Sequence, residues 1–277
     1  MSLQAKSTNS VNHHGRLTMK FANRGNKTVM TNCFQRPPLR ASRALYFNAA
    51  RPSEATVYMV ETSGGLLAGD QNDFQIEVEE GANVRLIPQS ATKIYPSFNG
   101  MWSSQNININ IASEARLTWK IEPVIPFEDA KFNGNTIINM ASDSTLLWGE
   151  ILAPGRLSHG ERFNYTKVRT NFQVWKNGEC LIYDPLLFTP ADVDFETLGL
   201  LEEHVYIGSL WFVAPSLEKL EIKILNEKLQ AFKNLKVSAS LLEGNTVNVR
   251  WLGSDLVLLM KEMDNLWKEF DGFDITS

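Results

Sequence analysis

The sequence is organised around T-S-G-G-L-L-A-G-D, residues 62–70, which is followed by P-Q-S-A-T-K-I-Y-P-S, residues 88–97. Glycine tolerates positive φ angles and lets other backbone approach closely. Three glycines in an apolar setting, directly before the carboxylate of Asp70, therefore predict a tight, crowded turn instead of a flexible linker. These turn glycines are Gly64, Gly65 and Gly69.

Between these two stretches lies a strand-like segment, 73–79, in which apolar and polar residues alternate. A corner at Gly81-Ala82 leads to a second short run, 84–86. We expect the two runs to pair as a β-hairpin, which would bring Asp70 close to a polar cluster. That cluster consists of Gln89, Ser90, Thr92 and Lys93.

The chain has 277 residues, of which 43% are hydrophobic and 21% charged, and its net charge is −4 at pH 7. Such a composition is typical of a soluble globular protein, and the charge argues against nucleic acid or an anionic membrane as a partner. No stretch reaches the ~20 apolar residues that cross a bilayer. The polar start, residues 1–14, predicts a disordered tail without a signal peptide. Cys33 and Cys180 are expected to be buried free thiols, and the protein is expected to be cytoplasmic.

Many short strands with regular turn signals follow one another along residues 15–212. The pattern predicts a mainly β fold, a large stack of short antiparallel or helically arranged strands. The strongest local signal is Asn177-Gly178 between the runs 171–176 and 180–184, because Asn-Gly is the preferred pair of a type I′ turn. We expect a hairpin there.

The composition changes after residue 212. Pro215-Ser216 precedes a helical pattern, two strands are expected at 237–242 and 246–252, and a last helix is expected to start at Ser254. We expect this helix–strand–strand–helix subdomain, 213–277, to pack its two helices on the β body. The two parts then form one domain, 15–277.

Motifs for catalysis are weak. Ser90 and Lys93 match S-x-x-K, but the companion motifs are missing and no clear helix carries the pair. No G-x-S-x-G motif, phosphate loop or dinucleotide fingerprint is present. Outside the tail the chain offers two histidines, His159 and His204, without metal-ligand spacing. We therefore expect a protein that is not an enzyme.

Three carboxylates stand beside apolar residues and are expected to point inward: Asp70, Glu150 and Asp184. A buried carboxylate is costly unless it is paired or used. Ion pairs with Lys93, Arg156 or Arg162 are one explanation. The other is that these oxygen ligands let a divalent cation pass without trapping it.

A second dense run, W-G-E-I-L-A-P-G-R-L-S-H-G-E-R-F, covers residues 148–163. Opposite charges so closely spaced suggest a salt network that fixes a bend, with a solvated loop as the alternative. The residues expected to form this bend are Gly155, Arg156, Gly160 and Glu161.

Taken together, these runs resemble the UreD (UreH) family of urease accessory proteins. The resemblance rests on several blocks in register between about residues 16 and 190. One departure is Pro96, where the family often has arginine, so a basic contact there is in doubt. The blocks are Pro38-Leu39-Arg40, 64–70, 89–97, 122–132, 148–163 and 176–184.

The resemblance implies a non-enzymatic maturation factor that binds urease apoprotein and a UreF-like protein and, through the latter, the UreG GTPase. It also implies delivery of nickel(II), held transiently and with no tightly bound cofactor, through a water-filled passage. A passive scaffold without a metal role and an S-x-x-K amidohydrolase remain alternatives. We expect Asp70→Ala to leave the fold intact but to lower urease activation. Candidates for lining the passage are Asp70, Gln89, Ser90, Thr92, Lys93, Glu150 and Asp184, with Asp70, Glu150 and Asp184 as transient metal ligands.

Overall fold

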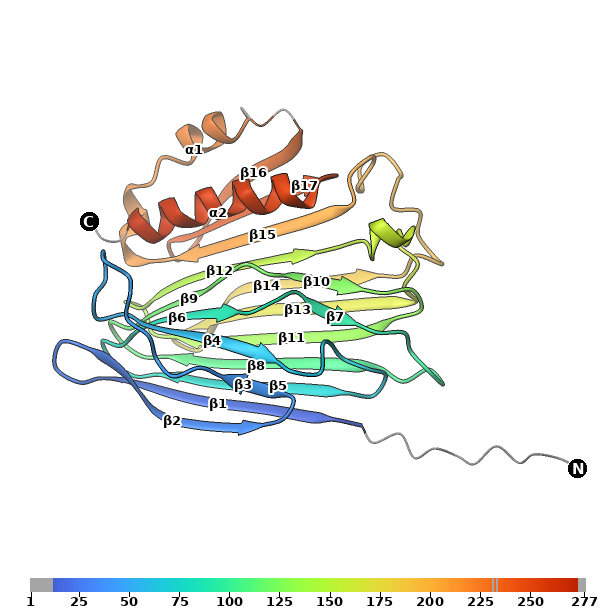
Figure 1. Cartoon of the computed structure of the whole chain (residues 1–277). Helices are drawn as coiled ribbons and strands as arrows, with labels where there is room; N and C mark the ends of the chain where they lie inside the picture. Colours follow the sequence, from blue (N-terminus) through green and yellow to red (C-terminus); the bar gives the residue numbers. More distant parts are fainter. Residues whose placement is uncertain (1–11, 231, 233, 274–277) are drawn as a thin grey trace, which may run out of the picture.

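The computed structural model describes residues 12–230, 232 and 234–273 and shows two stacked β-sheets with helices on the outer side of one of them (Figure 1). Most of the expected tail, residues 1–11, lies outside the described residues. The first strand, β1, already begins at His14. The fold is mainly β, as the sequence predicts.

Sheet A is built mostly from parallel strands. Five interior strands, β1, β5, β8, β11 and β13, run parallel, and the edge strands β2 and β14 are antiparallel to their neighbours. In spatial order, the seven strands formed by the described residues are β14 (Glu179–Phe188), β13 (Lys167–Lys176), β11 (Lys131–Met140), β8 (Ser103–Ile111), β5 (Gln71–Val78), β1 (His14–Asn23) and β2 (Thr28–Arg36).

Sheet B combines parallel strands in its middle with antiparallel strands at both ends. Two short strands, β10 (Pro123–Pro126) and β7 (Thr92–Ile94), extend it beside β12. The main strands, in spatial order, are β16 (Leu235–Leu242), β17 (Thr246–Gly253), β15 (Tyr206–Val213), β12 (Thr145–Leu152), β9 (Arg116–Trp119), β6 (Asn83–Pro88), β4 (Ala55–Glu61) and β3 (Leu39–Ala41).

The chain passes back and forth between the two sheets, which gives the helical arrangement of strands that the turn pattern predicts. The expected hairpin of residues 73–86 is wrong for the same reason. β5 belongs to sheet A and β6 to sheet B, so the corner at Gly81, with φ of 62°, turns the chain from one sheet to the other. Phe74 and Leu86 consequently belong to one core between the sheets and do not pair as neighbours in a ladder.

The Asn-Gly hairpin is confirmed. β13 and β14 pair antiparallel on either side of Asn177 and Gly178, whose φ angles are 52° and 84°. Both values lie in the left-handed region that a type I′ turn requires. The expected strands at 237–242 and 246–252 are present as β16 and β17, which continue sheet B beside β15.

The two α-helices, α1 (Ile222–Leu229) and α2 (Leu256–Phe273), cover the outer face of sheet B (Figure 1). The helical pattern predicted after Pro215 is split: Pro215–Lys219 is a 3-10 helix, and α1 starts only at Ile222. Asp255, one residue after the expected start, caps α2, because its carboxylate accepts the N–H groups of Val257 and Leu258 at 2.8 and 3.0 Å. A further 3-10 turn, Leu157–His159, follows β12.

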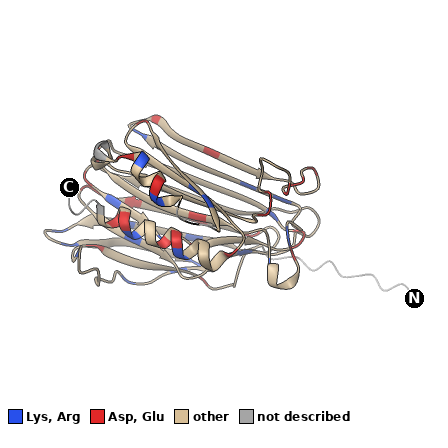
Figure 2. Ribbon diagram, turned by 90° about the horizontal axis from the view of Figure 1, so that it is seen from above, with Lys and Arg blue, Asp and Glu red and all other residues tan. Residues whose placement is uncertain are grey.

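Apolar side chains pack in two main layers, one between the sheets and one between sheet B and the helices. Seen from above, the helices carry acidic and basic residues close together (Figure 2), as in the ion pair of Lys268 with Asp264. No described helix is long and apolar enough to cross a membrane. Both cysteines are free, but Cys33 is half-buried and Cys180 is exposed, so the expectation of buried thiols is wrong.

Candidate functional site

A cavity of about 110 Å³, lined by both apolar and polar side chains, lies between the two sheets. This volume has room for several water molecules. Sheet A contributes side chains from β5, β8, β11 and β13, and sheet B contributes them from β4, β7 and β12 and from the segments beside them. The space, called the inter-sheet cavity below, exists because polar side chains interrupt the apolar layer between the sheets at this end.

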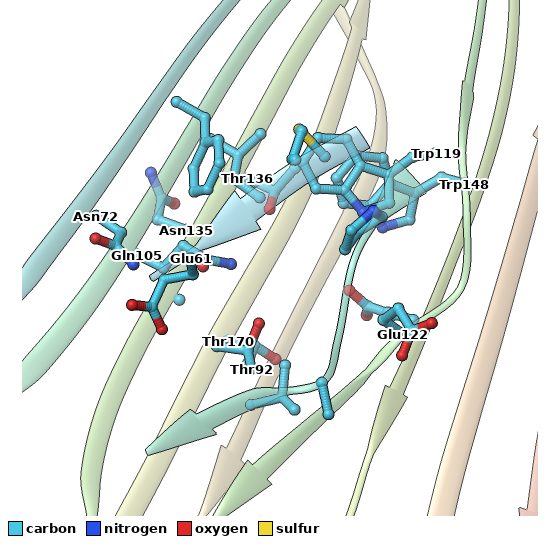
Figure 3. A pocket seen from close by; sticks show the side chains of 18 of the residues that line it. Glu61, Asn72, Thr92, Gln105, Trp119, Glu122, Asn135, Thr136, Trp148 and Thr170 are labelled. Carbon is cyan, nitrogen blue, oxygen red and sulfur yellow. The ribbon is translucent and has the colours of Figure 1, made fainter. Parts of the chain in front are cut away.

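Oxygen-bearing side chains enter the cavity from both sheets. In Figure 3, Glu61, Asn72 and Gln105 gather on one side, while Glu122 lies on the side of the tryptophans. The other labelled polar residues are Thr92, Asn135, Thr136 and Thr170. No histidine or cysteine of the described chain lines the cavity.

An aromatic row forms one wall. The rings of Trp119 and Trp148 stack with centroids 4.5 Å apart, and Phe172 follows Trp148 at 5.4 Å. Trp211 then stacks on Phe172 at 5.8 Å. Trp119, Trp148 and Phe172 line the cavity, so charges on that side face an apolar surface that screens them less than water does.

Glu150 is the carboxylate whose protonation is most perturbed. Burial is the main cause, and the negative charge of Asp184 adds to it, against the opposing charge of Arg250; together they raise the pKa of Glu150 from 4.5 to about 7. Asp184, from β14 of sheet A, forms an ion pair with Arg250, from β17 of sheet B. Two of the three predicted inward carboxylates, Glu150 and Asp184, thus lie together.

Glu122 stands just after β9. Burial raises its pKa, and the positive charge of Lys120 partly opposes the rise. Neither Glu122 nor Glu61 was identified from the sequence as a site residue, although both face the cavity. Glu61 is the last residue of β4 and Glu122 precedes β10, and a carboxylate at a strand end looks in sequence like any solvated residue.

Some of the residues predicted to line a passage do line the inter-sheet cavity, and others do not. Gln89, Ser90, Thr92 and Glu150 line the cavity, and the exposure of Gln89 and Ser90 places the cavity mouth there. Asp70, Lys93 and Asp184 are not among the lining residues.

Asp70 holds the glycine turn together. It is 4% exposed, and its two carboxylate oxygens accept the backbone N–H groups of His13 at 2.8 Å and Leu67 at 2.9 Å. Gly65 lies against β7: a Cβ atom there would be 2.5 Å from the carbonyl oxygen of Lys93. The two sequence stretches therefore do meet, through the bridge of Leu66 with Ile94 and not through a hairpin.

The bend after β12 carries the expected ion pair. The guanidinium of Arg156 donates to Glu161 at 2.9 Å, and Glu161 also accepts the backbone N–H of Glu128 at 3.2 Å. Gly155 and Gly160 have φ angles of 131° and 79°. These contacts support the salt-network interpretation of the bend over that of a solvated loop.

Ser90 and Lys93 do not form the arrangement that S-x-x-K catalysis needs. Lys93 lies in strand β7 with an exposed side chain, and Ser90 precedes that strand. A serine and its lysine base share a helix face when three residues apart, whereas in extended chain they point to different sides. The geometry thus offers no activated nucleophile at Ser90.

Because no described histidine or cysteine lines the inter-sheet cavity, its side chains can contact a cation only through oxygen atoms. Within the described ranges, no group of three or more His, Cys, Asp or Glu side chains is placed to hold a metal ion. Carboxylates, carboxamides and hydroxyls are poor at retaining a transition metal that favours nitrogen and sulfur ligands. The arrangement suits brief contacts with a hydrated divalent ion.

Comparison with known proteins gives one consistent result. The family model described as UreD urease accessory protein matches residues 13–273. A protein named Urease accessory protein UreD from Sporosarcina pasteurii is 60% identical over 255 residues, covering 92% of this chain and 99% of that protein. Proteins with the same name from Lysinibacillus sphaericus and Halalkalibacterium halodurans are 41% and 35% identical, each covering 94% of this chain and 96% and 94% of their own length.

Proposed function

The chain belongs to the UreD family of urease accessory proteins, and from this premise we propose that it helps to load nickel(II) into urease. In this proposal the protein binds the urease apoprotein and a UreF-like protein in the cytoplasm, and the UreF-like protein connects it to the UreG GTPase. Nickel(II) is cargo that moves through the inter-sheet cavity. The protein itself catalyses no reaction.

The observation that carries the proposal is the chemistry of the inter-sheet cavity. Its mouth at Gln89 and Ser90 is open to solvent, and its interior offers oxygen atoms from both sheets. An ion that is to be handed on must be attracted but not retained. Glu61 and Glu122 supply the attraction, and the lack of imidazole and thiolate among the lining residues favours release.

The test replaces the two carboxylates that face the cavity. We expect Glu61→Gln/Glu122→Gln to keep binding urease apoprotein and the UreF-like protein, while the nickel content of urease matured with it falls several-fold. Nickel per active site, measured by elemental analysis, is the readout. Glu80→Gln is the matched control, because Glu80 is exposed and outside the cavity.

A passive scaffold gives a different result. If the protein only brings partners together, the double variant should load urease with a normal amount of nickel. Variants that lose partner binding should then be the only ones that fail. Normal nickel content with the double variant would therefore refute a route through the cavity.

A further inference from the structure

Arg250 reaches across the interface between the sheets. Glu150, Ser209 and Arg250 are direct partners on three adjacent strands of sheet B, so their side chains share one face. Ser209, which lies between the two long side chains, is buried. From this face the Arg250 guanidinium crosses to sheet A and pairs with Asp184.

The Arg250 guanidinium lies near both carboxylates. It forms an ion pair with Asp184, and its charge also acts on Glu150. Its other contacts are weak: a long hydrogen bond of 3.4 Å from Nε to Asn248 and a position 5.8 Å from the ring of Trp211. The Arg250 side chain is 34% exposed, whereas that of Asp184 is 13% exposed, so the arginine can leave toward solvent while the carboxylate stays inside.

We propose that Arg250 is a tethered counter-cation that competes with the divalent cargo for Glu150 and Asp184. This inference rests on the proposed passage of nickel(II) through the inter-sheet cavity. Glu150 lines that cavity, and Asp184 and Arg250 lie next to Glu150 behind the lining residues. Arginine stays charged at every physiological pH, so Arg250 cannot release the carboxylates by losing its proton. Its side chain has to move away from them before a divalent ion can bind. While Arg250 is paired with Asp184, the site formed by the two carboxylates and the guanidinium carries less net negative charge and binds a divalent ion weakly.

The same guanidinium charge offsets the repulsion between the two neighbouring carboxylates. A permanent divalent site in this position would trap the cargo. Between transfers the Arg250 guanidinium neutralises the two carboxylates, and when it returns to them after a transfer it displaces the divalent ion. If the Arg250–Asp184 ion pair were purely structural, its loss would alter the stability of the fold and leave the affinity for cations unchanged.

The experiment measures Ni²⁺ binding to the full chain by titration calorimetry. We expect Arg250→Gln to bind Ni²⁺ at least about tenfold more tightly than the original protein, because a unit charge a few ångströms away is removed from a weakly screened site. Arg250→Gln/Asp184→Asn should lose that gain, and Arg250→Lys, which keeps the charge, should show no gain. Arg169→Gln is the control, since Arg169 is exposed and its guanidinium bonds Asn133 at 2.8 Å, outside the cavity.

Arg250→Met provides a second neutral variant that keeps apolar contact with Trp211, for use if Arg250→Gln does not fold by circular dichroism. Unchanged Ni²⁺ affinity in the folded neutral variant would overturn the inference. The two proposals can fail separately. Tighter binding by the Arg250 variant together with normal nickel loading by Glu61→Gln/Glu122→Gln supports competition between Arg250 and divalent ions at Glu150 and Asp184, but refutes the passage through the cavity. The reverse pattern supports the passage and refutes the competition by Arg250.

Discussion

Asp271, close to the end of α2, accepts a hydrogen bond of 2.7 Å from Arg85 of β6. Two further arginines approach the same carboxylate, Arg116 at 3.0 Å and Arg51 at 3.1 Å. Arg85 is also paired with the fully buried Glu54 at 2.6 Å. One residue of the C-terminal helix is thus the point at which three separate segments of the β body are joined to that helix.

Asp271→Asn should lower the free energy of unfolding by about 3 kcal/mol, because it removes a negative charge that three largely buried arginines share. Burial alone raises the pKa of Asp271, but Arg85 and the other arginines outweigh it, so the pKa is lowered from 3.8. A lowered carboxyl pKa stabilises the fold fully above the unfolded pKa, and this stabilisation disappears as the pH falls through the folded pKa. The difference between variant and original protein should therefore shrink when urea unfolding is compared at pH 7 and pH 3.

Glu269→Gln is the control for this prediction. Glu269 is on the same helix and pairs with Lys228, but both side chains are at least half exposed. Such a surface pair contributes little, and we expect a change below about 1 kcal/mol at either pH. If Glu269→Gln lost as much stability as Asp271→Asn, this would contradict the view that the buried ion pairs of Asp271 fix α2 to the β body.

The parts of the fold that were predicted correctly are those encoded locally. Asn177-Gly178 specifies its turn by backbone conformation alone, and the hairpin is present. The error at 73–86 has the opposite origin. Alternation shows that a segment is a strand with one buried face, but it does not say whether the next strand pairs beside it or packs against it from another sheet.

The candidate site was predicted less completely than the fold, for a related reason. Glu150 was expected to point inward because it follows Trp148, and it does line the cavity. Asp70 also stands beside apolar residues in the sequence, but in the structure its carboxylate stabilises the glycine turn. This role depends on where two backbone N–H groups lie, which the sequence does not show. The placement of Arg250 opposite Asp184 depends on how the sheets stack and has no counterpart in the sequence around either residue.

Gly149→Ala should destabilise the protein. A Cβ atom on Gly149 would be 2.1 Å from Cγ1 of Ile121, and both residues are packed within sheet B and its neighbouring segment. Overpacking of this kind costs about 1–3 kcal/mol. Thermal unfolding should show a lower midpoint, and the double variant Gly149→Ala/Ile121→Ala should lose less stability than the sum of its single changes.

Gly272→Ala tests the same substitution where there is room, since within the described residues no atom beyond the adjoining helix backbone and chain neighbours lies within 4 Å of the Cβ position. Alanine is the better helix former by up to about 1 kcal/mol, so this variant should be unchanged or slightly more stable. Equal losses at positions 149 and 272 would show that close packing against Ile121 is not the reason.

Asp70→Ala should reduce stability, contrary to the expectation from sequence that it leaves the fold intact. The substitution removes the carboxylate acceptor of the part-buried hydrogen bonds from the backbone N–H groups of His13 and Leu67. We expect a loss of about 2–3 kcal/mol in urea unfolding. Asp194→Ala is the comparison, because the Asp194 carboxylate accepts one exposed N–H, from Glu196 at 3.0 Å, and its loss should be much smaller. Equal stability of the two variants would restore a purely functional role for Asp70.

Glu150 should make the protein less stable as the pH rises through neutrality. Its pKa is raised from 4.5 to about 7 in the fold, so the folded protein binds the proton more tightly than the unfolded chain does. This contribution is complete below pH 4.5 and is lost as the pH rises through 7. Because a tenfold difference in proton affinity corresponds to about 1.4 kcal/mol, the loss is at most about 3.5 kcal/mol.

Glu150→Gln cannot ionise, so its stability relative to the original protein should increase between pH 5 and pH 8.5. A carbon-13 titration of the Glu150 carboxyl gives the pKa directly, and a value near 4.5 would contradict the prediction. Asp184→Asn should lower that pKa, because it removes a negative charge and leaves Arg250 free to face Glu150. Most of the elevation should nevertheless persist in that variant, since burial of Glu150 is its larger cause.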